Sequence, residues 1–215
     1  MIFTNVSRLG DFLLLLPVAS WYYKKYNEKI HWVLSDNFSL YHKIEPLLLL
    51  QELTEKVSYV DVGTDAGNPN HWNFDPEQFG IDGDYFNFGF WGSIREYFPQ
   101  FYARRYDLGV DNDFVINLGI PNIKESYSVW IESSPYRNEF GKLRSIIPTN
   151  CKELKSDFIS DALHAQSATE VFCTMGGFAI ILDLCNIKCN IYATPEMIND
   201  AFIYYRNPHN FRILN

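Results

Sequence analysis

Hydrophobic residues along the first 62 positions alternate between short and longer apolar segments. Apolar runs at 2–6, 30–35 and 57–62 have the length of strands, and the segments at 12–27 and 39–53 have the length of helices. Strands separated by helices are typical of βαβ units, because two parallel strands need a crossover connection between them. The pattern therefore predicts a parallel sheet in the first third of the chain.

Residues 63–100 break this alternation. Gly, Asn, Pro and Asp recur there among aromatic residues, and one short strand is expected at 85–90. Long insertions of this kind often serve as functional lids, and the rings could stack on a sugar or nucleobase; the alternative is a satellite hydrophobic cluster. The aromatic residues concerned are Trp72, Phe74, Phe79, Phe86, Phe88, Phe90 and Trp91.

A second α/β unit is expected after a helical or irregular segment at 101–118 and a linker at 121–126. Its expected strands are 127–132, 143–147, 170–174 and 189–193, its expected helices are 152–166 and 177–186, and a closing segment covers 195–205. We therefore expect an α/β protein of two Rossmann-like lobes with parallel sheets. The N-terminal lobe would span residues 1–124, and a reduced C-terminal lobe would span 125–215.

Composition narrows the classes of function. The 215 residues are 47% hydrophobic and 20% charged, as in ordinary globular domains with a sound core. The net charge of -8 argues against a nucleic-acid partner, because the only tight basic clusters are Lys24-Lys25 and Arg104-Arg105. The apolar run at 12–23 is interrupted by Pro17 and too short to span a bilayer, so we expect no integral membrane segment and a cytoplasmic protein.

The cysteines show no metal-binding or redox spacing. No CxxC pair is present and their neighbours are apolar, so reduced and mostly buried thiols are expected. These residues are Cys151, Cys173, Cys185 and Cys189.

Two glycine turns, one in each half of the chain, carry the candidate chemistry. Arg8-Leu9-Gly10-Asp11 follows the first strand, and Thr174-Met175-Gly176-Gly177 follows the strand at 170–174. A strand end that leads through a glycine turn into a helix favours anion binding, because free backbone N–H groups and the helix dipole coincide there. The alternatives are a capping role for Asp11 and tight strand–helix packing at the second turn. Neither a P-loop nor a GxGxxG pattern is present.

The opening strand, the turn at 8–11 and an apolar helix containing Pro17 resemble the start of the heptosyltransferase-like family 9 glycosyltransferases of the GT-B fold. Residues 167–194 resemble the segment with which that family grips the diphosphate of a nucleotide sugar. The resemblance implies a glycosyltransferase that moves a sugar from a nucleotide-sugar donor to a hydroxyl of a glycan or another acceptor. It also implies that the donor is a co-substrate, with no cofactor and no metal.

The resemblance also implies roles for single residues. Asp11 would be the catalytic base that takes the proton of the acceptor hydroxyl. The residues expected to contact donor or substrate are Arg8, Gly10, Ser133, Ser134, Arg137, Thr174, Gly176 and Gly177, with Lys142 as a further cation. Metal binding by the Asp-x-Asp sequences at 82–84 and 111–113 is disfavoured, because both fall in turn-like settings.

Departures from the family pattern support an alternative. Met175 and Gly176 stand where the family usually has Asp-Ser, and Ile180 stands where it has His. The C-terminal half is also short. These differences favour a non-catalytic nucleotide- or sugar-binding or assembly protein, or a homo-oligomer in which another subunit completes the cleft. A third alternative is a nucleotide-dependent α/β enzyme of another type.

Overall fold

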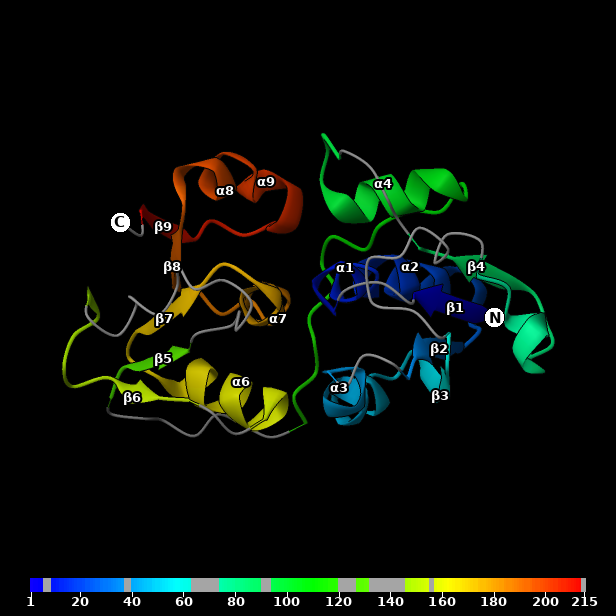
Figure 1. The fold of residues 1–215 in the computed structure, drawn as a ribbon, viewed down its shortest axis with the longest axis horizontal. Helices are drawn as coiled ribbons and strands as arrows, with labels where there is room; N and C mark the ends of the chain where they lie inside the picture. The colour runs from blue at the N-terminus through cyan, green and yellow to red at the C-terminus, as the bar shows by residue number, and fades with distance from the viewer. Residues whose placement is uncertain are drawn as a thin grey trace. The chain divides into compact units, whose positions relative to one another are not determined.

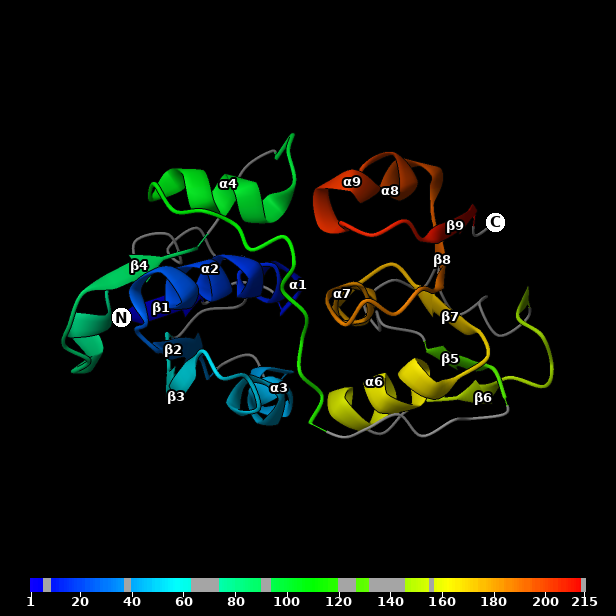
Figure 2. The same ribbon diagram turned by 180° about the vertical axis from the view of Figure 1, so that it is seen from behind.

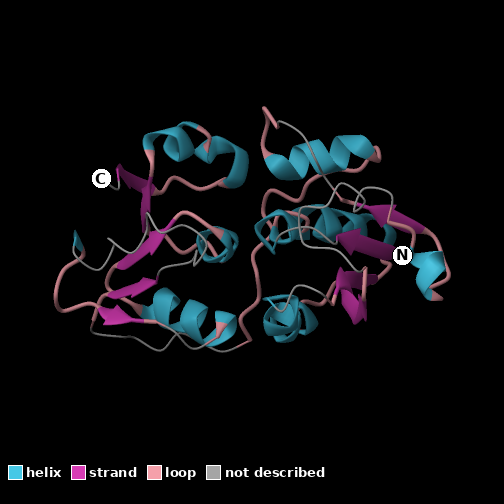
Figure 3. Ribbon diagram, viewed as in Figure 1, coloured by secondary structure: helices cyan, strands magenta, loops and turns pink. Residues whose placement is uncertain are grey.

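The chain forms two compact units, Met1–Phe114 and Val115–Asn215, in the computed structural model. Each unit has its own parallel sheet with helices beside it (Figures 1, 2 and 3). The structure describes residues 1–5, 9–36, 40–62, 74–89, 94–119, 127–131, 146–154 and 157–213. The expected α/β class with two parallel sheets is confirmed.

The first unit is built on a four-stranded sheet in the order β3-β2-β1-β4, in which all neighbours are parallel. Its elements are β1 (Ile2–Asn5), α1 (Leu9–Leu13), α2 (Leu16–Tyr26), β2 (Ile30–Ser35), α3 (Leu40–Leu49), β3 (Thr54–Val60), the 3-10 helix η2 (Pro76–Phe79), β4 (Tyr85–Asn87) and α4 (Phe98–Arg105). The strands expected at 2–6, 30–35 and 57–62 are confirmed as β1, β2 and β3.

The single helix expected at 12–27 is wrong, because the structure has two helices there. Helix α1 ends at Leu13 and α2 begins at Leu16. Pro17 lies in the first turn of α2, where its missing N–H costs nothing. Within a continuous helix its ring would clash with the carbonyl group of Leu13, four residues earlier, so the chain breaks before it.

The insertion at 63–100 contributes a strand and core side chains to the first unit. Strand β4 pairs in parallel with β1, with Phe86 opposite Phe3. Phe88 is fully buried, and its ring centroid lies 5.1 Å from that of Phe3. This part of the insertion therefore belongs to the core. Trp72, Phe90 and Trp91 lie outside the described residues, so their expected stacking role stays a prediction.

The second unit is built on a five-stranded parallel sheet in the order β6-β5-β7-β8-β9. Its elements are β5 (Val129–Ile131), β6 (Lys152–Glu153), α6 (Phe158–Ser167), β7 (Val171–Thr174), α7 (Gly177–Leu184), β8 (Asn190–Ala193), α8 (Pro195–Asn199), α9 (Ala201–Tyr204) and β9 (Asn210–Ile213). The strands expected at 127–132, 170–174 and 189–193 are confirmed as β5, β7 and β8.

Three expectations for the second unit need correction. The strand expected at 143–147 is wrong at 146 and 147, a helical residue and a bend; 143–145 lie outside the described residues. Strand β6 lies instead at the start of the helix expected at 152–166. That helix begins only at Phe158, because the Asp157 side chain caps it by accepting a hydrogen bond of 2.8 Å from the N–H of Ser160. Strand β9 was not expected, since its four residues, Asn-Phe-Arg-Ile, are too few to predict a strand from their alternation.

Helix α7 forms the centre of the second unit. Every residue from 178 to 184 is buried, as expected for a helix that is apolar on all sides. It packs against β7 and α6. Cys173, Cys185 and Cys189 are buried, Cys151 is half-buried, and all four are free thiols, which confirms the expectation for the cysteines. Within the described part of the chain, no helix is long and apolar enough to cross a membrane.

Candidate functional site

The first glycine turn lies at the carboxyl end of β1. Helix α1 begins at Leu9, so Gly10 and Asp11 are its second and third residues, and both are half-buried. Asp11 therefore lies in the first turn and not at the capping position, which corrects the simple capping alternative. A carboxylate in a first helical turn is stabilised by the positive end of the helix dipole. Arg8, expected beside it, lies outside the described residues.

Two buried tyrosines lie within electrostatic range of Asp11. Tyr41 on α3 and Tyr102 on α4 are both fully buried. Burial raises the pKa of each phenol well above its usual range, and the negative charge of Asp11 raises it further. Both hydroxyl groups are therefore neutral at physiological pH. Asp11 is thus partly exposed and lies within electrostatic range of two neutral, buried phenols.

Asn5, the last residue of β1, fixes one of these tyrosines. Its buried side-chain amide donates hydrogen bonds to the hydroxyl oxygen of Tyr102 at 3.4 Å and to the carbonyl oxygen of Phe88 at 3.5 Å. Arg105 donates a 2.8 Å hydrogen bond to the carbonyl oxygen of Gly89, and its positive charge lowers the pKa of Tyr102 against the effect of burial. Three elements, β1, α3 and α4, therefore contribute polar groups around Asp11.

The sequence analysis missed these neighbours of Asp11. Asn5 gave a usable signal, because a polar residue that ends an apolar strand in a parallel sheet often belongs to a site. The two tyrosines gave none. They are two of 14 tyrosines, and only the packing of α3 and α4 shows that they are buried near a carboxylate.

The second glycine turn joins β7 to α7. Thr174 ends β7 and is fully buried, whereas Gly176 and Gly177 are half-buried. Gly176 is extended, with φ 168° and ψ -168°, so the backbone conformation does not require glycine at this position. The capping residue of α7, Gly176, has no side chain with which to cap the helix, and the first turn contains no acidic residue. The positive end of this helix dipole is therefore not compensated by the helix itself.

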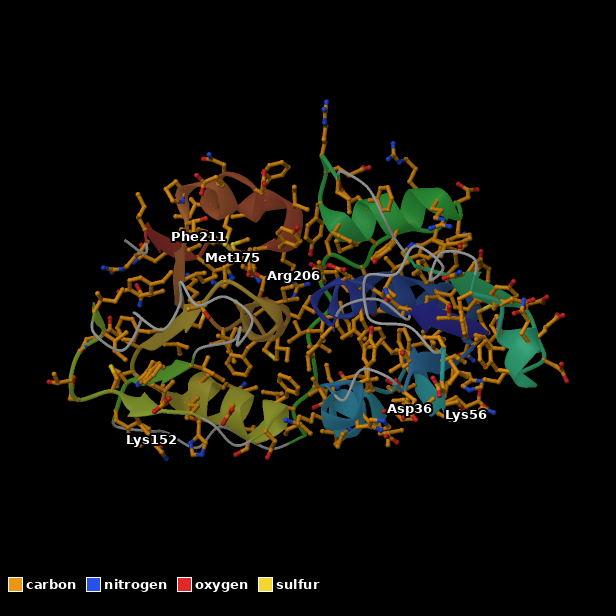
Figure 4. All side chains as sticks on the ribbon, in the orientation of Figure 1. Asp36, Lys56, Lys152, Met175, Arg206 and Phe211 are labelled. Atoms are coloured by element: carbon orange, nitrogen blue, oxygen red, sulfur yellow. The ribbon has the colours of Figure 1, made fainter. Side chains whose placement is uncertain are left out.

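Tyr205 ties the segment after α9 to this turn. Burial raises the pKa of its phenol well above the usual range, and a hydrogen bond with the backbone of Gly176 opposes that shift. Figure 4 labels Met175, which follows Thr174, and Arg206, which follows Tyr205. Met175 and Ile180 are both buried, with exposures of 5% and 4%. Their side chains therefore belong to the core of the second unit.

Four buried side chains of the second unit form a chain of contacts. The Asp183 carboxylate lies 2.8 Å from His209 Nε2, and His209 Nδ1 lies 3.5 Å from Cys189 Sγ. Cys189 Sγ lies 3.7 Å from Cys173 Sγ. The backbone N–H groups of Arg206 and Asn207 also donate to the Asp183 carboxylate, at 3.1 and 3.0 Å. The carboxylate of Asp183 on α7 thus connects this helix to the segment that follows α9.

The pKa values of the residues in this chain of contacts are shifted from their usual values. Burial disfavours the charged form of His209, but hydrogen bonds with Asp183 and Cys189 outweigh it and raise its pKa to about 9. The hydrogen bond from the Cys173 thiol lowers the pKa of Cys189, with help from His209. The pKa of Cys173 is raised by that same contact and by burial. These pKa directions favour a thiolate–imidazolium pair of Cys189 and His209 across their 3.5 Å contact. The sequence analysis missed it, since these residues share no motif spacing.

The other predicted residues divide into two groups. Gly10 and Asp11 lie together in the first unit, and Thr174, Gly176 and Gly177 lie together in the second. Ser133, Ser134, Arg137 and Lys142 lie outside the described residues. Asp111, from an Asp-x-Asp sequence, accepts a 2.5 Å hydrogen bond from Ser20 Oγ and pairs with Lys24 Nζ at 2.7 Å. Its contacts therefore bind α2 to the segment that closes the first unit.

No protein-family model and no curated protein sequence matches the chain. Its structure, however, is similar to solved glycosyltransferases. A family 9 glycosyl transferase from Veillonella parvula DSM 2008 aligns with a TM-score of 0.62 at 10% identity, over 99% of this chain and 84% of that chain. The E. coli heptosyltransferase WaaC with ADP aligns with a TM-score of 0.63 at 10% identity, over 99% of this chain and 92% of that chain.

A third similar structure is the E. coli ADP-heptose lps heptosyltransferase II. It aligns with a TM-score of 0.57 at 10% identity, over 99% of this chain and 89% of that chain. At these identities the likeness concerns the fold. The expected structural resemblance is confirmed, and the chain has the α/β fold with parallel sheets that these heptosyltransferases share.

Proposed function

We propose that the protein is a glycosyltransferase that transfers a sugar from a nucleoside-diphosphate sugar to an acceptor hydroxyl. The observation that carries the proposal is the likeness to family 9 glycosyltransferase structures over 99% of the chain. One of those structures contains ADP and another contains ADP-2-deoxy-2-fluoro heptose. An adenosine diphosphate sugar is therefore the first donor class to test.

The turn at the start of α7 is the proposed site for the donor diphosphate. Gly176 at the capping position has no side chain to cap the N–H groups at the start of α7, and the first turn has no acidic side chain to compete with an anion. A diphosphate bound there would gain both hydrogen bonds and dipole stabilisation. Thr174 and Gly176 would line this site. Arg8, Ser133, Ser134 and Arg137 remain proposed contacts to phosphate or sugar.

Asp11 is the proposed base. As the acceptor oxygen forms its bond to the anomeric carbon of the sugar, the bond from that carbon to the diphosphate breaks, and Asp11 takes the acceptor proton. The nucleoside diphosphate leaves with the electron pair of the broken bond. Neutral Tyr41 and Tyr102 beside Asp11 limit its solvation from the buried side, which favours the protonated product of this step.

A charge placed on the α7 turn tests the donor site. In Gly177→Glu the carboxylate would interact favourably with the helix dipole but repel a diphosphate, so the fold should persist while ADP binding is lost. Gly177→Gln is the matched control, because it has nearly the same size without the charge. Binding is measured by calorimetric titration with ADP, UDP and GDP. If no nucleoside diphosphate binds the unaltered protein, the proposed function is wrong.

A second candidate function is nucleotide-sugar binding without turnover. It is favoured by buried Met175 and Ile180, which stand where the family has Asp and His. The release of nucleoside diphosphate from a panel of nucleotide sugars and acceptors separates the two functions. Binding with release that depends on Asp11 supports the transferase. Binding without release under any acceptor supports the second function.

A further inference from the structure

The sulfurs of Cys173 and Cys189 lie 3.7 Å apart inside the second unit. Cys173 lies on β7, and Cys189 directly precedes β8, the parallel neighbour of β7. A disulfide bond has a sulfur–sulfur distance of about 2.05 Å, so the two atoms would need to approach by roughly 1.7 Å. Cys173 is opposite Ile191 in the ladder, two residues beyond Cys189, so formation of the bond requires the segment before β8 to shift toward β7.

The two sulfurs have different surroundings, which suit different roles. Cys189 Sγ lies 3.5 Å from His209 Nδ1, and the other ring nitrogen of His209 lies 2.8 Å from the Asp183 carboxylate. The imidazolium stabilises a thiolate at Cys189, which is the nucleophilic form of a cysteine. Cys173 keeps its proton and faces that thiolate. One sulfur can therefore attack an oxidant, and the other can resolve the product.

Burial limits which oxidants can reach the pair. Cys173 is fully buried and Cys189 is only 4% exposed. A bulky disulfide such as oxidised glutathione would have to bring its own sulfur into contact with Cys189, which this burial prevents. A small hydroperoxide needs only a transient opening of the width of a water molecule. The site therefore selects oxidants by size.

We propose that Cys173 and Cys189 are a redox-active dithiol that a small hydroperoxide oxidises to a disulfide. The Cys189 thiolate attacks one peroxide oxygen and the O–O bond breaks, which gives a sulfenic acid at Cys189. The leaving hydroxide takes the proton of the His209 imidazolium and departs as water. The Cys173 sulfur then attacks the Cys189 sulfur, the S–O bond breaks, and the second hydroxide leaves as water with the Cys173 proton. Two thiols and one hydrogen peroxide thus give one disulfide and two waters.

Peptide mapping of the full-length protein tests the proposal. The folded protein is treated with hydrogen peroxide or with oxidised glutathione, alkylated in denaturant, and digested with trypsin. Because Lys188 separates them, Cys173 falls on peptide 156–188 and Cys189 on peptide 189–206. Peroxide should link these peptides, remove the mass of two hydrogen atoms and leave two of the four cysteines alkylated. Oxidised glutathione should leave all four alkylated.

Cys185 provides the matched control, because it lies on the same tryptic peptide as Cys173. It is also buried, and burial raises the pKa of its thiol to about 12, so it remains protonated. Cys185→Ala should retain the linked peptides, whereas Cys173→Ala and Cys189→Ala should lose them. A wild-type protein that keeps four alkylated cysteines after peroxide, or a link that survives in Cys173→Ala, would overturn the proposal. In the wild-type protein, fragmentation of the linked peptide 156–188 shows whether Cys173 or Cys185 carries the alkyl group, so the link is assigned even if a variant does not fold.

Discussion

The polar groups singled out in the two units differ in their exposure to solvent. Around Asp11 in the first unit, a half-exposed carboxylate faces neutral buried phenols. In the second unit, the side chains of Asp183 and His209 have no exposed surface and are paired with each other. A carboxylate with an open side can serve a substrate, whereas a fully paired one serves mainly to hold segments together. The contrast is consistent with the proposed chemical role of Asp11 and with a structural role of Asp183 between α7 and the segment after α9.

The first prediction tests the chemical half of this contrast and has the largest expected effect. Asp11→Asn should reduce turnover of a nucleotide sugar by about 10²- to 10⁴-fold, the usual contribution of a general base. The free energy of unfolding should change by less than about 1 kcal/mol, because Asn keeps the shape of the side chain and the interaction of a half-exposed carboxylate with the helix dipole is small. Turnover is followed by nucleoside diphosphate release, and stability by urea unfolding. Unchanged turnover would remove Asp11 from the mechanism.

The second prediction tests the structural half. Asp183→Ala leaves the buried His209 ring without its carboxylate partner and removes the acceptor of two backbone N–H groups. The free energy of unfolding should fall by about 3–5 kcal/mol, as for other broken buried ion pairs. Asp36→Ala is the control, because Asp36 pairs with His42 at an exposed position and should cost less than about 1 kcal/mol. Equal losses in urea unfolding would contradict the contrast.

The third prediction uses the pH dependence of the buried pair. The raised pKa of His209, about 9, alone gives stability that is present below about pH 6.5 and lost as the pH rises through about 9. The lowered pKa of Cys189 has the opposite effect, because its stabilisation grows as the pH rises toward the unfolded thiol value of about 8.5. Between about pH 6.5 and 8.5 the folded and unfolded pairs hold the same number of protons, so the two effects cancel.

Cys189→Ala should break this cancellation. In this variant Asp183 still holds the pKa of His209 above its usual range. Between about pH 6.5 and 8.5, the free energy of unfolding should therefore fall by on the order of 1 kcal/mol more than in the wild type. Urea unfolding at about pH 6.5, 7.5 and 8.5 measures the difference between the two profiles. Cys185→Ala should follow the wild-type profile, since its thiol is protonated throughout. Parallel profiles for Cys189→Ala and the wild type would argue against the thiolate–imidazolium pair.

The fourth prediction has the smallest effect and concerns the surroundings of Asp11. Tyr102→Phe removes the hydroxyl oxygen that accepts a hydrogen bond from the Asn5 amide. The free energy of unfolding should fall by about 0.5–1.5 kcal/mol, the net value of one buried hydrogen bond. Tyr106→Phe is a useful comparison, because its hydroxyl donates to the carbonyl oxygen of Asn87 at a less buried position. A larger loss in Tyr106→Phe would show that burial of the phenol does not decide the cost.

Local patterns in the sequence were enough for most of the fold. Ile30–Ser35 and Val171–Thr174 are runs of apolar residues long enough only for strands, and both are buried strands in the structure. The patterns failed where short-range chemistry outweighed hydrophobicity. Pro17 divided an apolar helix, and the Asp157 cap delayed the start of α6 to Phe158.

The two glycine turns were visible in the sequence because each follows an apolar strand and precedes an apolar helix. The surroundings of those turns were not visible. Tyr41 and Tyr102 reach Asp11 only through the packing of α3 and α4, and His209 reaches Asp183 only because the segment after α9 folds back on α7. Periodicity is a property of neighbours along the chain and therefore determines elements. Charge balance and proton positions depend on contacts between distant residues, which only the tertiary structure decides.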